Sequence, residues 1–122
     1  WIDEMSTGVF PRDIIGMLSD SLEYFYRRDW RTSIVLSSIS AEMILAEMYE
    51  EAFQRPAPVE PLGTLLDKLM KKGELAEEMK ASCRRVTQMR KSAVHRGLAP
   101  PTIREASLAL YGAIQLAFCH YL

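Results

Sequence analysis

Residues 34–49 read IVLSSISAEMILAEMY, and the fold that we expect for this chain follows from them. It is apolar on almost every side of a helix, and only small residues and two acids, Glu42 and Glu47, interrupt it. A helix that is hydrophobic all round is normally buried in the centre of a domain. Asp29 stands where it can cap the N-terminus of such a helix. The sequence therefore predicts a central helix over residues 30–53.

Helices are also predicted on both sides of this segment. Before it, apolar residues at helical spacing predict a helix over 11–28, and Pro11 stands where a first-turn proline is tolerated. After it, the prolines between residues 55 and 61 cannot remain helical, because proline lacks the amide hydrogen and clashes with the preceding turn. A short helix is then expected over 62–72, and Gly73 ends it.

The last part of the chain is predicted to form two more helices. One is expected over 74–95, with acidic residues near its start that complement the positive end of the helix dipole. The other is expected over 102–122, where Thr102 and Glu105 form a capping box. No segment alternates between apolar and polar residues. We therefore predict an all-α, four- to five-helix up-and-down bundle that forms a single domain over residues 1–122.

Length and composition are those of one globular domain. The chain has 122 residues, of which 48% are hydrophobic and 25% charged, and this composition excludes intrinsic disorder. Two cysteines, Cys83 and Cys119, are too few for a disulfide scaffold or a cysteine metal cage. A reducing, cytoplasmic setting is therefore expected. Because the first residue is Trp1, we expect a trimmed chain or an excised domain.

Residues 106–122 contain no charged side chain, which raises the question of a membrane span. A span needs about 20 apolar residues, and this segment includes Ser107, Gln115 and His120. We therefore expect no membrane partner, and burial of the segment in the core or in a helix–helix dimer interface. His120 is expected to be structural or exposed.

Charge is distributed unevenly along the chain. The net charge is −1, yet residues 79–122 carry seven bases and a single acid, Glu105. No carboxylate occurs between Met79 and Arg104. Such a block either meets an anion or faces the acidic part of its own or a neighbouring chain.

Missing motifs exclude several catalytic classes. The chain has no GxGxxG or GxxxxGK[ST] phosphate loop, no GxSxG nucleophile elbow and no HExxH motif. Neither histidine has a glutamate three residues before it, as carboxylate-bridged dimetal bundles require. We therefore expect no cofactor and no metal ion.

The run CRRVTQMRKSAVHRG at residues 83–97 contains Arg90, four intervening residues and His95. With this motif at the end of the penultimate long helix, before a last apolar helix, the chain resembles the HEPN superfamily. The helix that contains Glu42 is similar to the second helix of that family. The resemblance implies a HEPN-like domain that forms a homodimer, in which two Arg–His motifs face each other in one composite cleft. It further implies metal-independent cleavage of RNA in a defence or toxin–antitoxin setting, with an antitoxin or another domain as a further partner.

The resemblance also implies roles for individual side chains. His95 would exchange a proton with the ribose 2′-hydroxyl or the leaving oxygen, and Arg90 would hold the phosphate. Glu42 and Lys91 are supporting candidates, and Glu42 either pairs with an arginine such as Arg90 or points outward. The candidates for binding the RNA backbone are Arg84, Arg85, Lys91 and Arg96.

Other interpretations of the same residues stay open. Arg90, Lys91, His95 and Arg96 all lie in the last turns of a predicted helix, where cations offset the helix dipole. Active HEPN members commonly have a small polar residue where this chain has Lys91. That difference favours a catalytically inactive HEPN-like module that dimerises and binds a nucleotide or a protein, within a larger chain. A helical dimerisation domain without a ligand is a third interpretation.

Helix geometry constrains the catalytic interpretation. Five residues along a straight α-helix leave Arg90 and His95 roughly 140° apart around the axis. The two side chains can share a face only if the helix ends between them, or if a second subunit brings in a partner.

Overall fold

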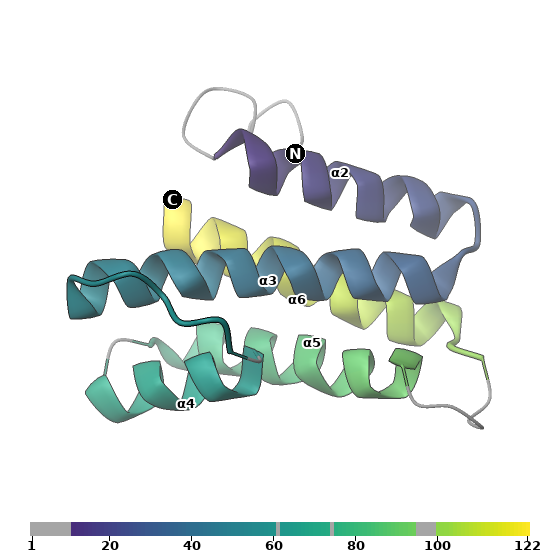
Figure 1. Ribbon diagram of the computed structural model, residues 1–122. Helices are drawn as coiled ribbons and strands as arrows, with labels where there is room; N and C mark the ends of the chain where they lie inside the picture. The colour runs from purple at the N-terminus through teal and green to yellow at the C-terminus, as the bar shows by residue number, and fades with distance from the viewer. Residues whose placement is uncertain (1–10, 61, 74, 95–99) are drawn as a thin grey trace.

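The computed structural model describes residues 11–60, 62–73, 75–94 and 100–122, and these residues form five helices and no strand (Figure 1). The predicted all-α bundle is therefore confirmed. The helices are α2 (Arg12–Tyr26), α3 (Trp30–Phe53), α4 (Leu62–Lys72), α5 (Glu77–Val94) and α6 (Ile103–Tyr121).

Successive helices alternate in direction with one exception (Figure 1). The linker after α3 runs back alongside the bundle, so α4 runs in the same direction as α3. The C-terminal ends of these two helices consequently lie together, and Lys72 Nζ donates a hydrogen bond of 2.5 Å to the carbonyl oxygen of Ala52. The proline-containing linker makes this return possible because it cannot continue α3 as a helix.

The central position predicted for residues 30–53 is confirmed, because α3 packs against each of the other four helices. Its buried side chains accordingly point in several directions around the helix axis. The buried residues of α3 are Ser33, Ile34, Ser37, Ser38, Ser40, Ala41, Ile44, Leu45, Met48 and Tyr49.

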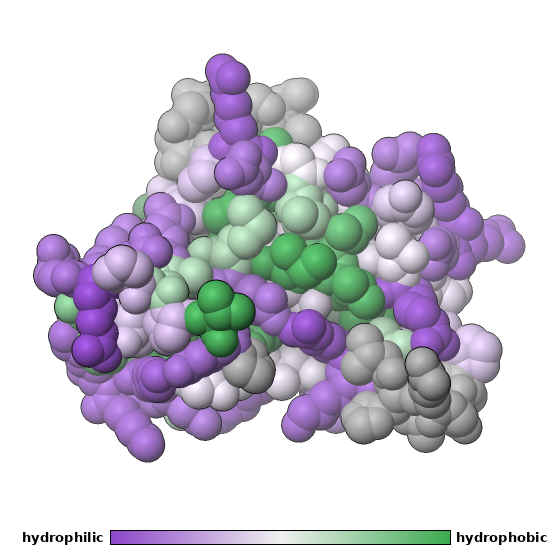
Figure 2. Space-filling view, viewed as in Figure 1, coloured by the Kyte–Doolittle hydropathy of each residue, from purple (hydrophilic) through white to green (hydrophobic). Residues whose placement is uncertain are grey.

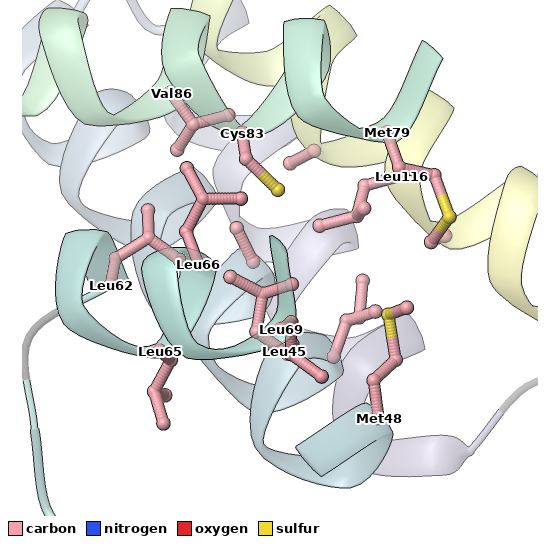
Figure 3. Packing of buried hydrophobic residues seen from close by; sticks show 14 of the residues in the cluster. Leu45, Met48, Leu62, Leu65, Leu66, Leu69, Met79, Cys83, Val86 and Leu116 are labelled. Atoms are coloured by element: carbon pink, nitrogen blue, oxygen red, sulfur yellow. The ribbon is translucent and has the colours of Figure 1, made fainter. Parts of the chain in front are cut away.

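The main core fills the space between α3, α4, α5 and α6, and it includes Ile14 and Leu18 of α2. Figure 3 shows leucines of α4 facing Cys83 and Val86 of α5, with Leu116 of α6 and Leu45 of α3 beside them. The four side chains from α3, α5 and α6 that are named here are fully buried. The amphipathic leucine pattern of α4 therefore packs against α3 and α5.

Helices α5 and α6 approach each other closely because small residues line their contact. A Cβ atom added at Gly112 of α6 would lie 3.0 Å from Val86 Cγ2 and 3.1 Å from the carbonyl oxygen of Ser82. The other small buried residues of α6 are Ala106, Ala109, Ala113 and Ala117. This close packing confirms that one face of the segment is buried in the core, while Tyr111 and Leu122 on its other side are exposed.

A cluster of serines joins α2 to α3. Ser21 Oγ donates to the carbonyl oxygen of Ser33 at 2.7 Å, and Ser33 Oγ donates to the carbonyl oxygen of Ser21 at 2.9 Å. Ser37 Oγ lies 2.8 Å from Ser21 Oγ. All three side chains are completely buried. Each hydroxyl therefore has a partner inside the protein, as buried polar groups require.

The predicted helix ends are largely confirmed. Asp29 caps α3 by accepting a hydrogen bond from the Thr32 amide, and Thr102 and Glu105 form the capping box of α6. Gly73, after α4, has a φ of 76°, which glycine adopts without strain.

The bounds of α2 and α5 differ from the prediction. Helix α2 ends at Tyr26, two residues early, and Pro11 precedes the helix as its N-cap residue. Helix α5 begins at Glu77 and not near residue 74, because Leu75 and Ala76 are not helical. Glu74 and His95, which the prediction placed at the two ends of this helix, lie outside the described residues.

Within the described part of the chain, no helix is both long enough and apolar enough to cross a membrane. This agrees with the interpretation of residues 106–122 as a core helix.

Candidate functional site

The side chain of Arg90 pairs with the side chain of Glu42. Arg90 lies near the C-terminal end of α5, Glu42 lies in the middle of α3, and Arg90 Nη1 donates to Glu42 Oε1. Of the two orientations left open for Glu42 by the sequence, the structure shows the one paired with Arg90.

This ion pair is only partly covered. The Arg90 side chain is 38% exposed and that of Glu42 is 28% exposed. A partly exposed ion pair contributes little to stability, because water screens the attraction. Its main consequence is to fix the guanidinium in one orientation. A guanidinium has five N–H donors in a rigid plane, so a group held through Nη1 can still offer other donors to an anion.

A second contact holds the end of α5. Arg31 Nη1, in the first turn of α3, donates a 2.6 Å hydrogen bond to the carbonyl oxygen of Ala93. The last carbonyls of a helix lack partners within the helix and carry its negative dipole, so a cation is well placed there. Sequence reasoning missed Arg31, because no local pattern reveals that its partner lies in a distant helix.

The structure describes one of the two predicted catalytic residues, Arg90 and His95. Arg90 is placed, whereas His95 and the RNA-binding candidate Arg96 lie outside the described residues. The described part of α5 ends at Val94.

The structure separates the remaining RNA-binding candidates into two groups. Arg84 and Lys91 line one groove of about 550 Å³ between α4 and α5, together with Thr87 and Gln88. Arg85 lies on another side of α5, where its Nη1 is 3.5 Å from Gln115 Oε1 of α6. Arg84, Gln88 and Lys91 share a helix face because they are four and three residues apart.

The groove between α4 and α5 has mixed chemistry. Its walls include Leu66 and Met70, and one acid, Asp67, stands opposite the two cations. In this groove, Arg84 and Lys91 can contact the phosphates of a nucleic-acid backbone. Asp67 can accept hydrogen bonds from polar groups of a ligand.

A different cluster could hold a metal ion. Single ligand atoms of Glu47 and Glu51 on α3 and of His120 on α6 all lie within 4.8 Å of one another. Tyr121 donates its hydroxyl hydrogen to Glu47 Oε2. Burial of the Tyr121 phenol, followed by this hydrogen bond and the charges of Glu47 and Glu51, raises its pKa above the ordinary value, so it remains a donor. No local sequence pattern indicates this cluster, because its members come from helices far apart in the chain.

Comparisons of this chain with family models, with curated proteins and with solved structures find no match.

Proposed function

We propose that this chain is a HEPN-like RNA-binding domain that cleaves RNA as a dimer without a metal ion. The single observation that carries the proposal is the position of Arg90. Arg90 lies near the end of α5, and Glu42 of α3 orients its guanidinium. More than a third of the Arg90 side chain nevertheless remains exposed. An arginine held in this way is preorganised to bind a phosphate group and to stabilise the charge that develops on it during cleavage.

The proposed reaction needs an acid–base group beside this arginine. His95 follows Arg90 by five residues and has a reference pKa of about 6.5 for its residue type. In the proposed mechanism the imidazole takes a proton from the ribose 2′-hydroxyl, and the oxygen attacks the neighbouring phosphorus. An imidazolium then protonates the leaving 5′-oxygen, so the protons balance over the two steps.

The two cationic side chains of the groove between α4 and α5 would bind RNA without regard to its nucleotide sequence. Arg84 and Lys91 lie along one face of α5, and Lys91 directly follows Arg90. Each phosphate that they neutralise releases counterions, so the affinity for RNA should fall as the salt concentration rises.

The proposed dimer has a candidate interface on α3. Residues 35, 39, 42, 43 and 46 fall on one face of this helix by their spacing, and all of them are only partly buried. Figure 2 shows hydrophobic side chains gathered over the middle of the visible face of the molecule. Two copies that pack through the α3 face would bring the Arg90–Glu42 pair of each chain to a common cleft, since Glu42 belongs to that face.

Two observations favour a second candidate function. The carboxylate of Glu42 already compensates the positive charge of Arg90, and Lys91 follows Arg90 where active members of the superfamily commonly have a small polar residue. Both features suit the catalytically inactive alternative, a dimerisation module that binds a nucleotide or a protein.

The test uses single-stranded RNA with a fluorescent 5′ label, incubated with the purified chain in EDTA. The variants are Arg90→Ala and His95→Ala, and Arg27→Ala is the control, because Arg27 is an exposed arginine that pairs with Glu23 on α2. We expect cleavage by the wild-type chain and by Arg27→Ala, and a loss of about 10²–10⁴-fold in the other two. Equal cleavage by all four proteins would assign it to a contaminant and overturn the proposal.

Binding and mass measurements separate the two candidate functions. RNA binding by the wild-type chain without any cleavage would support the inactive module. Arg84→Ala and Lys91→Ala should each weaken binding and reduce the salt slope by about one unit. Light scattering should give the mass of a dimer, and a monomer at all concentrations would exclude the composite cleft.

A further inference from the structure

We propose that Glu47, Glu51 and His120 form a binding site for a divalent transition-metal ion, with Zn²⁺ as the preferred occupant. Two carboxylates come from successive turns of α3, and the imidazole comes from the last turn of α6. The site is separate from Arg90 and does not depend on the proposed function.

The spacing of the ligand atoms fits one ion. His120 Nε2 and Glu51 Oε1 are 3.9 Å apart, too far for a hydrogen bond, and the three ligand atoms lie within 4.8 Å of one another. Two ligands at about 2.1 Å from a tetrahedral Zn²⁺ stand roughly 3.4 Å apart. A small movement of Glu51, whose side chain is 63% exposed, would therefore close the site around an ion.

Two further features suit a metal site. Tyr121 donates a hydrogen bond to Glu47, which orients one ligand as outer partners of metal ligands do. Glu51 and His120 also line a cavity of about 410 Å³ with Met48, Ala52 and Met79. This cavity gives the ion a route of entry and leaves room for a water molecule as the fourth ligand.

The ligand set decides which metal is expected. The imidazole favours zinc and related first-row ions, which also accept carboxylate ligands, whereas Mg²⁺ and Ca²⁺ prefer oxygen ligands alone. Mg²⁺ is therefore expected to bind more weakly than Zn²⁺. An ion at this position would tie the last turn of α6 to the C-terminal half of α3.

The experiment is calorimetric titration of ZnCl₂ into the full chain after treatment with EDTA and its removal. We expect one Zn²⁺ per chain, no comparable heat with MgCl₂, and a rise in melting temperature with Zn²⁺. His120→Ala and Glu51→Gln should each lower the affinity at least tenfold.

The chain offers matched controls for both variants. His95→Ala removes the other histidine, and Glu50→Gln removes an exposed acid beside Glu51 on the same helix. Both controls should bind Zn²⁺ as the wild-type chain does. Melting curves in EDTA show whether each variant is folded, and the absorption spectrum of bound Co²⁺ reports the coordination directly.

Three results would overturn the proposal. They are the absence of Zn²⁺ binding by the folded wild-type chain, unchanged binding by folded His120→Ala, and loss of binding in His95→Ala. None of them bears on RNA cleavage in EDTA, so this site and the proposed function can fail independently.

Discussion

Replacement of Gly112 by alanine is the sharpest test of how α5 and α6 pack. The new Cβ would lie 3.0 Å from Val86 Cγ2 and 3.1 Å from the carbonyl oxygen of Ser82. Val86 is fully buried, and the Ser82 carbonyl belongs to the backbone of α5, so neither neighbour can move alone. The substitution must therefore push the two helices apart.

The expected magnitude combines two opposing effects. Overpacking of a tight core costs about 1–3 kcal/mol, whereas glycine to alanine within a helix gains up to about 1 kcal/mol from conformational entropy. The net expectation is a loss of about 0–3 kcal/mol in the free energy of unfolding. Gly112→Val adds two more methyl groups at the same place and should destabilise the chain further.

Gly16 provides the matched control. It lies within α2, and a Cβ there would meet nothing within 4 Å. Gly16→Ala should therefore stabilise the chain by about 0.5–1 kcal/mol. Urea denaturation followed by circular dichroism measures both variants. If Gly112→Ala stabilised the chain as much as Gly16→Ala does, the close contact between α5 and α6 would be refuted.

Three further perturbations follow from the contacts described above. Ser21→Ala should cost about 1–3 kcal/mol, since it leaves buried partners on α3 without a hydrogen bond; a thermal melt indistinguishable from wild type would contradict this. Burial raises the pKa of the Cys83 thiol to about 12 from 9.0. The unfolded chain therefore loses this proton first, and the free energy of unfolding should fall between pH 9 and pH 12, by up to about 1.4 kcal/mol per pH unit from this thiol. Urea denaturation at several pH values gives the free energy of unfolding, which should fall less steeply with pH in Cys83→Ala than in the wild-type chain. An equally steep fall in both proteins would exclude the effect. A double-mutant cycle of Glu42→Gln and Arg90→Gln should give a coupling of no more than about 1 kcal/mol, because the pair is partly exposed; a coupling of several kcal/mol would show that the pair is a structural element of the core.

The sequence was sufficient for the positions of the helices. Caps such as Asp29 and Thr102, and the prolines after α3, act through hydrogen bonds and steric clashes within a few residues. The period of apolar residues likewise depends only on the turn of a helix. The start of α5 was predicted three residues early, since a favourable acid near a helix terminus does not by itself begin the helix.

The candidate sites depended on tertiary structure. Arg90, Arg31 and His120 each contact a residue of another helix. The spacing of residues along one helix does not show how that helix is rotated against its neighbour. Arg85 shows the same point from the opposite side. It was grouped with Arg84 in the sequence, yet the helical turn directs the two neighbours to different sides of α5.

An all-helical chain with α3 at its centre was therefore predictable from the amino-acid sequence, because α3 is apolar on almost every side. The packing of the helices was needed to show that Glu42 contacts Arg90 and that two carboxylates lie near His120. The physical reason is that local hydrogen bonding and apolar periodicity form helices, whereas contacts between side chains depend on the packing of whole helices against one another.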